Sequence, residues 1–172
     1  MHVALYTFGV LDPSAPVEKL ADFRERGAQI YANAKTAAGY IGHAEKPKEL
    51  VGRAVAIGQD FGAWGSFAIP TRLPGALGVQ VTGCITTLSV WRDIESARAF
   101  VYGGDHRSAL ARRSDWFVKG AWPGSVLWRI DVGITPTWSH GVQRLESLAT
   151  HGDTADHFTF GSHYCALVPT EN

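Results

Sequence analysis

The order of strand-like and helix-like stretches constrains the fold of this chain more than any other feature of its sequence. The stretch "HVALYTFGV" alternates and is rich in strand formers, which predicts a strand over residues 2–10. "YIGHA" predicts a second, short strand. Between them, residues 17–38 predict a helix with Ser14 as its N-cap, because apolar side chains recur there at the spacing of one helix face, at Leu20, Phe23, Gly27, Ile30 and Ala34.

The second half of the chain repeats the order. The β-branched run "VQVTGCITTLSVW" predicts a strand over residues 79–91, and Asp93 is expected to cap a short helix after it. Asp105 is expected to cap a second short helix that continues to about Phe117. Another strand, "SVLWRIDVG", and a helix from about Thr137 to Gly152 follow.

This order, β-α-β-β-α-β and then a helical tail, predicts an α+β fold of the ferredoxin-like type. In that fold a four-stranded antiparallel sheet carries helices on one face, and here a C-terminal helix and tail would follow. We expect residues 1–172 to form a single domain, with residues 46–78 as an irregular, lid-like insertion.

The face of the sheet without helices is expected to expose apolar side chains such as Val79, Val81, Ile85 and Val90. A second copy of the same sheet would cover this face, so we predict a homodimer in the form of a dimeric α/β barrel. Each half of such a dimer would hold a pocket between its sheet and its helices.

Charge and composition exclude several functions. Lys plus Arg equal Asp plus Glu at 16 each, so no net field attracts nucleic acid or an anionic membrane. The apolar run of "MHVALYTFGV" has no basic start and stops at Asp12, which argues against a signal peptide or a membrane span. We therefore expect a cytoplasmic protein without nucleic-acid or membrane partners, whose two cysteines, Cys84 and Cys165, are reduced.

His106 is the candidate catalytic residue in "YGGDHRSALARRSDWF". In the first turn of a helix, the dipole disfavours a positive imidazole, and a neutral one can serve as a general base or substrate anchor. Helical spacing would place Arg113 and Phe117 on the same face, so that a base and a cation face one apolar cleft. Alternatively, His106 bonds a loop carbonyl and Arg113 pairs with Asp115 or with solvent.

Six tryptophans are many for this length, and most are expected to be core. Trp64 differs because it lies in the glycine-rich "DFGAWGSFAIP", where it would be either a lid over a pocket or an ordinary loop anchor.

Patterns for metals and nucleotide cofactors are missing from the sequence. "HGDTADHFTFGSHYC" is rich in histidine and aspartate, but its spacing matches no common ligand frame, so we predict no metal site. No glycine string has the pattern of a phosphate loop or a dinucleotide turn.

Three pieces of the sequence carry a family resemblance: "TLSVWRDIESARAFVYGGDHRSALARRSDWFVKGAWP", "VLWRIDVGITPTWSHGVQRLESLATHG" and "DHFTF". Together with the weaker "VALYTFG" and "WGSFAIP", they resemble the family called domain of unknown function 3291. The resemblance implies the dimeric α/β-barrel fold of antibiotic-biosynthesis monooxygenases. It implies no reaction, because such barrels host oxygenases, cyclases, isomerases, haem enzymes and ligand binders. This chain departs from the family at Arg129, where members commonly have an aromatic residue, and the change alters either a pocket wall or an exposed face.

These observations favour a small-molecule tailoring enzyme that acts on an aromatic or polyketide-like metabolite. It would work without an organic cofactor, by oxygenation or by cyclisation and isomerisation through an enolate. His106 would be the base or anchor and Arg113 the oxyanion partner, and the pocket walls would be Trp64, Trp91, Tyr102, Trp116, Phe117 and Trp128. Two alternatives are a haem enzyme with His106 as the axial ligand and a non-catalytic ligand-binding dimer.

Overall fold

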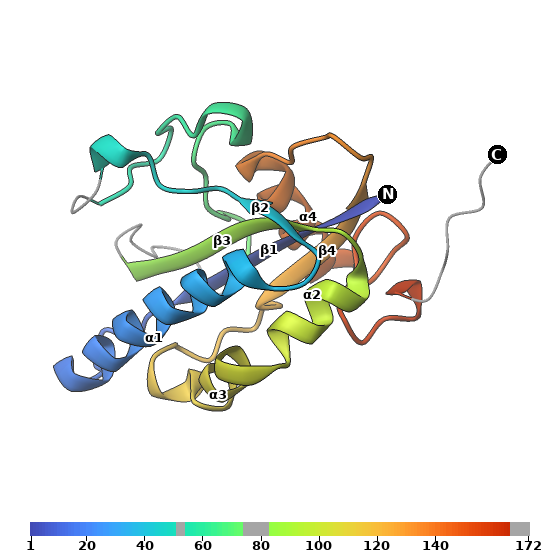
Figure 1. Cartoon of the computed structure of the whole chain (residues 1–172). Helices are drawn as coiled ribbons and strands as arrows, with labels where there is room; N and C mark the ends of the chain where they lie inside the picture. The colour runs from blue at the N-terminus through green and yellow to red at the C-terminus, as the bar shows by residue number, and fades with distance from the viewer. Residues whose placement is uncertain (51–53, 74–82, 166–172) are drawn as a thin grey trace.

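The computed structural model of the chain describes residues 1–50, 54–73 and 83–165. The described chain forms a four-stranded antiparallel sheet in the order β2-β3-β1-β4 (Figure 1). Its strands are β1 (His2–Val10), β2 (Tyr40–His43), β3 (Cys84–Trp91) and β4 (Ser125–Ile130). Its α-helices are α1 (Val17–Thr36), α2 (Ile94–Val101), α3 (Gly104–Ala111) and α4 (Trp138–His151). The predicted ferredoxin-like α+β fold is therefore confirmed.

Each face of the sheet has its own core, because alternate side chains of β1 point to opposite sides. Tyr6 and Phe8 pack on the side of α4 and of residues 61–73. Val3 and Leu5 pack on the side of α2 and of Phe158. Figure 1 shows α1, α2 and α3 together on one side of the sheet and α4 on the other. In the part of the chain that the structure describes, no helix is both long and apolar enough to span a membrane.

Because this chain covers both faces of its own sheet, the apolar-face argument for a homodimer is wrong. Val90 lies on the α4 side and is only 4% exposed, because this chain covers that face itself. Ile85 lies on the opposite face, since residues five apart along a strand point to opposite sides. Val79 and Val81 lie outside the described residues. The homodimer stays a prediction, and the apolar face chosen as its reason no longer supports it.

The predicted N-cap is correct for α2 and wrong for α1. Asp93 caps α2, and its carboxylate accepts a hydrogen bond of 2.7 Å from the backbone N–H of Ser96. Ser14 does not cap α1, whose N-cap is Pro16; the Ser14 hydroxyl instead donates to Asp12. The turn before α1 is therefore held by its own aspartate.

Gly141 allows α4 to lie directly on β1. A Cβ atom at Gly141 would be 2.6 Å from Cδ2 of Tyr6, a distance that real Cβ atoms do not adopt. One turn earlier, Trp138 packs edge-on against Tyr6, Phe61 and Phe67, with ring centroids 6.3, 5.4 and 5.0 Å away. The helix thereby brings residues of the insertion onto the sheet.

Glu146 of α4 holds the other end of the insertion. Its buried carboxylate accepts hydrogen bonds from the backbone N–H groups of Thr71 and Arg72, at 2.8 and 2.9 Å, and from the Arg72 guanidinium at 3.0 Å. A buried carboxylate with three donors is well satisfied and restricts the backbone that supplies them. Of the predicted insertion, residues 54–73 contain only a short 3-10 helix, Gly62–Trp64, and form an anchored cover of the sheet.

We expect Gly141→Ala to lower the free energy of unfolding by about 1 to 3 kcal/mol, because the added methyl group must displace α4 or Tyr6. Gly27→Ala is the matched control. Gly27 also lies inside a helix, but a Cβ there meets nothing within 4 Å. This substitution should raise stability by about 0.5 to 1 kcal/mol through helix propensity. Urea unfolding of both variants measures the difference, and equal effects would contradict the role given to Gly141.

Candidate functional site

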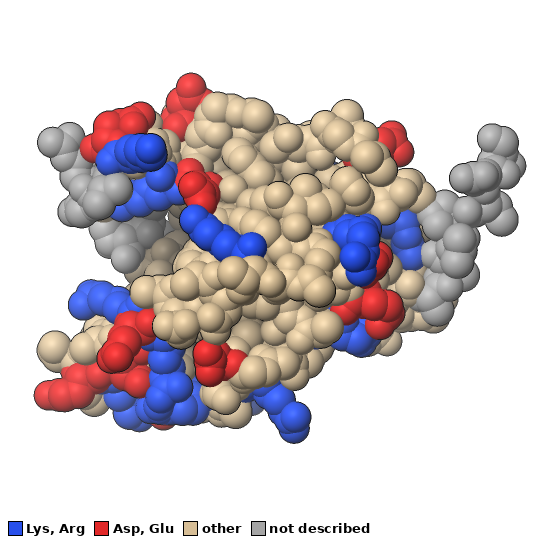
Figure 2. Space-filling view, viewed as in Figure 1, with Lys and Arg blue, Asp and Glu red and all other residues tan. Residues whose placement is uncertain are grey.

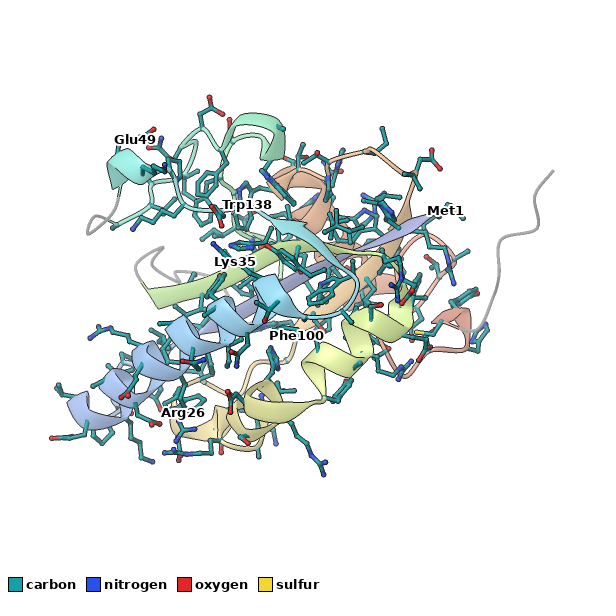
Figure 3. All side chains as sticks on the ribbon, in the orientation of Figure 1. Met1, Arg26, Lys35, Glu49, Phe100 and Trp138 are labelled. Carbon is teal, nitrogen blue, oxygen red and sulfur yellow. The ribbon has the colours of Figure 1, made fainter. Side chains whose placement is uncertain are left out.

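An open cleft of about 410 Å³ runs along the edge strand β2. A cleft of this size accommodates a small organic molecule. It is lined by residues from the end of α1, from β2 and its continuation, and from the insertion, namely Lys35, Tyr40, Ile41, Gly42, His43, Glu45 and Trp64. Figure 3 labels Lys35 where the last turn of α1 approaches β2.

A β-bulge in β2 arranges the polar side chains of this cleft. Tyr40 pairs with Trp91, and Gly42 pairs with Val90, the adjacent residue of β3. Ile41 therefore has no partner of its own in β3. In a regular strand, residues three apart point to opposite faces. The bulge changes this alternation, and it puts Tyr40 and His43 on the same face of the sheet.

Tyr40, His43 and Glu45 form a connected chain of polar groups. The Tyr40 hydroxyl is hydrogen-bonded to Nδ1 of His43, and Nε2 of His43 lies 3.7 Å from Oε1 of Glu45. With the His43 proton on Nε2, the atom that faces Glu45, Nδ1 can accept the Tyr40 proton. The order hydroxyl, imidazole, carboxylate is the arrangement that activates a hydroxyl for proton transfer.

The surroundings keep the hydroxyl and the imidazole neutral. Burial lowers the pKa of His43; Glu45 opposes this effect and Lys35 adds to it. Burial also raises the pKa of Tyr40, as does the nearby Glu45 carboxylate. Ion pairing with Lys35 lowers the pKa of Glu45 itself. At neutral pH the chain is therefore a neutral Tyr40–His43 pair beside an ionised carboxylate.

Aromatic rings lie on both sides of the β2 edge. On one side of the sheet edge, the Tyr31 ring lies 5.3 Å from the His43 ring, and its hydroxyl is buried enough to raise the pKa of Tyr31 to about 12 even though the residue is 42% exposed. On the other side, the Trp64 indole lies beside Gly42, where an added Cβ would be 3.8 Å from it. The cleft thus spans both sides of the β2 edge.

The structure separates the two predicted catalytic residues from this cleft. α3 has Gly103 as its N-cap and ends at Ala111, so the predicted cap at Asp105 and the continuous helix to Phe117 are wrong. The Asp105 carboxylate instead accepts a hydrogen bond of 2.8 Å from Asn33 of α1.

His106 faces the interior between α2 and α3. Its ring lies 5.2 Å from that of Phe100, which Figure 3 labels beside α2. Burial lowers the pKa of His106, and backbone groups at Val101 and at His106 itself offset only part of this effect. Arg113 is exposed in a short 3-10 helix beside Gly124, and Asp115 pairs with Lys19 and Arg112 instead.

The predicted wall residues are spread over the whole molecule. Only Trp64 lines the cleft, and Trp91 lies behind it, 5.6 Å from the Tyr40 ring. Trp116 and Phe117 pack against Phe23 of α1. The other two are further away: Trp128 is buried under the guanidinium of Arg144 on the α4 side, and Tyr102 is 51% exposed against Phe160.

The C-terminal histidines and Arg129 have structural contacts. His157 is buried, with Nδ1 3.3 Å from the Thr154 hydroxyl, and His163 packs on Tyr164. Among the residues that the structure describes, no three His, Cys, Asp or Glu side chains are grouped as a metal site requires. Arg129 lies over the Phe158 ring and donates to the Tyr164 carbonyl at 2.7 Å, so it holds the C-terminal segment.

Sequence reasoning missed the polar residues of the cleft because their arrangement depends on the bulge. "YIGHAE" reads as a short strand in which Tyr40 and His43 diverge. The sequence does contain one signal, Gly42 between Ile41 and His43 in an edge strand, since glycine within a strand often marks a bulge.

The comparisons with known proteins identify a family and no reaction. A family model described as "Domain of unknown function (DUF3291)" matches residues 2–170. None of the curated proteins matches the chain significantly.

Several solved structures are similar over most of the chain. A conserved protein from Methanosarcina mazei Go1 has a TM-score of 0.46 and 11% identity, over 76% of this chain and 94% of that one. A "Putative antibiotic biosynthesis monooxygenase" from Nitrosomonas europaea has a TM-score of 0.43 and 9% identity, over 78% and 94%. One of the same description from Chloroflexus aurantiacus J-10-fl has a TM-score of 0.37 and 13% identity, over 78% and 97%.

We expect His106→Ala to lower the free energy of unfolding by about 1 to 2 kcal/mol, because it removes a half-buried ring that packs on Phe100. Ligand binding in the β2 cleft should not change. His151→Ala, which removes an exposed histidine from the last turn of α4, should alter stability by no more than about 0.5 kcal/mol. Thermal unfolding and ligand binding measured on both variants test this. Lost binding with unchanged stability in His106→Ala would instead restore His106 as a site residue.

Proposed function

The chain belongs to the family of domain of unknown function 3291, whose description names no reaction, and we propose that it is a small-molecule enzyme. In this proposal it removes a proton from an aromatic or polyketide-like metabolite in the β2 cleft. The observation that carries the proposal is the bulge that aligns Tyr40, His43 and Glu45 beside aromatic walls. Bulges occur often next to active sites, where they redirect side chains.

The proton would move in two coupled transfers. The substrate gives a proton to the Tyr40 oxygen, while the hydroxyl proton of Tyr40 passes to Nδ1 of His43. The hydroxyl is thus regenerated, the substrate becomes an enolate or phenolate, and the imidazole becomes an imidazolium. Glu45, 3.7 Å from Nε2, stabilises that imidazolium.

An enolate or phenolate leads to the reactions expected from the sequence. It can attack a carbonyl within the same molecule, which is cyclisation, or accept the proton at another carbon, which is isomerisation. An electron-rich aromatic anion can also react with oxygen without an organic cofactor. The Trp64 indole, which lines the cleft, offers a flat aromatic surface to a planar substrate in each case.

Proton transfer can be tested with β-tetralone, an aromatic ketone whose α-hydrogens exchange through its enol. In deuterated buffer, NMR should show faster exchange with the wild-type protein than with buffer alone. Tyr40→Phe and His43→Gln should each lower the enzymatic rate by about a hundredfold or more. Tyr102→Phe, which removes the hydroxyl of a half-exposed residue outside the cleft lining, should keep the wild-type rate. Wild-type rates in Tyr40→Phe and His43→Gln would contradict the proposal.

The haem enzyme and the non-catalytic ligand-binding protein, the two alternatives, predict different measurements on the same purified variants. A haem enzyme would show a Soret band that His106→Ala removes. A ligand-binding protein without chemistry would bind aromatic ketones equally well in wild type and Tyr40→Phe and would not accelerate exchange in either.

A further inference from the structure

We infer that the β2 cleft ionises a neutral aromatic hydroxyl compound, a phenol or an enol, through an exchange of ion-pair partners. Lys35 leaves Glu45 for the new oxyanion of the ligand, and Glu45 turns to the newly protonated His43. The inference rests on the proposed function and names the ligand class and a further ligand-binding residue, Lys35, for the same site.

The ion pair between Lys35 and Glu45 is close but easily opened. Nζ of Lys35 lies 2.5 Å from Oε1 of Glu45, and the two side chains are 53% and 60% exposed. Exposed pairs of this kind contribute only about 0 to 1 kcal/mol, so a ligand oxygen can replace the carboxylate at little cost. Both residues line the cleft, so the exchange requires only side-chain rotation.

Glu45 already lies between two possible partners. The same oxygen that contacts Lys35 is 3.7 Å from Nε2 of His43. That distance is too long for a hydrogen bond with a neutral imidazole, but protonation of His43 would add a charge that attracts the carboxylate. Lys48 is a further cation near Glu45, and it would remain there after Lys35 leaves.

The exchange conserves charge at every step. Before it, Lys35 and Glu45 neutralise each other, and the ligand and His43 are neutral. The hydroxyl proton of the ligand then passes to Tyr40, and the proton of Tyr40 passes to His43. Afterwards the oxyanion pairs with Lys35 and the imidazolium pairs with Glu45. Two ion pairs replace one, so ionisation of the ligand and protonation of His43 favour each other.

The shape of the cleft selects a flat ligand. Gly42 has no side chain to fill the space beside the Trp64 indole, and Ile41, which also lines the cleft, is 46% exposed. Figure 2 shows that this face is largely uncharged over the middle of the molecule. A carboxylate or phosphate ester could also reach Lys35, but it brings no proton for His43 and would leave the imidazole neutral.

The test uses para-nitrophenol, because its visible absorbance distinguishes the phenol from the phenolate. At a pH where the free probe is mostly neutral, the wild-type protein should bind it largely as phenolate. Lys35→Met should lower phenolate affinity about tenfold, because it removes a charged hydrogen-bond donor. Binding of para-nitroanisole, which has no proton to lose, should not change. Lys19→Met is the matched control, since Lys19 is in the same helix and pairs with Asp115 outside the cleft.

A second measurement follows the proton. In wild type, the ring signals of His43, identified by their loss in His43→Gln, should move to the positions of an imidazolium when the probe binds. In Glu45→Gln the probe should still bind to Lys35, but the His43 signals should stay at their neutral positions. The inference is overturned if Lys35→Met binds phenolate as tightly as wild type, or if Lys19→Met weakens binding equally. It is also overturned if His43 stays neutral in the wild-type complex.

This experiment separates the inference from the proposed function, because it measures binding without turnover. If Lys35-dependent phenolate binding is found but β-tetralone exchange is not accelerated, the proposed reaction fails and the ligand class stands. If exchange is accelerated but Lys35→Met binds phenolate as wild type does, only the partner exchange fails.

Discussion

The contact between Gly141 of α4 and the ring of Tyr6 in β1 is the constraint on which the rest of the structure depends. Only a residue without a side chain lets the helix lie this close to the sheet. From that position α4 directs the buried Glu146 at the backbone of residues 71–72 and holds the insertion in place. The insertion then places the Trp64 indole beside Gly42 of β2. A helix packed against the middle of the sheet thus determines one wall of a cleft at its edge.

The other wall depends on an irregularity in an edge strand. A regular β2 would direct Tyr40 and His43 to opposite faces, and no hydroxyl–imidazole pair would form. The bulge at Ile41 brings them together and leaves Ile41 itself 46% exposed. It also shortens the regular part of an edge that could otherwise pair with another strand. One extra residue therefore both arranges the polar groups and limits edge-to-edge association.

Local patterns were enough to predict the elements and their order. Alternation in β1, the spacing of apolar residues in α1 and the aspartate cap of α2 are read within a few residues, and the structure confirms them. The same reasoning failed where distant contacts compete with local preference. Asp105 has the right side chain for a helix cap, but it bonds Asn33 of α1. His106 was placed beside Arg113 by helical spacing, yet α3 ends at Ala111 and its histidine packs on Phe100.

The sequence by itself determined the ferredoxin-like order of strands and helices and the position of α4. The spacing of apolar residues and the helix caps that indicate these elements are local properties of the chain. It also carried the family resemblance that the match over residues 2–170 confirms. Only the tertiary structure decided which chemical groups meet. Lys35, His43 and Trp64 come from a helix, a strand and a loop, and they share a cleft because of one bulge and one helix packed on the far face. Gly42 hints at the bulge, but which side chains meet there depends on how separate segments fit together.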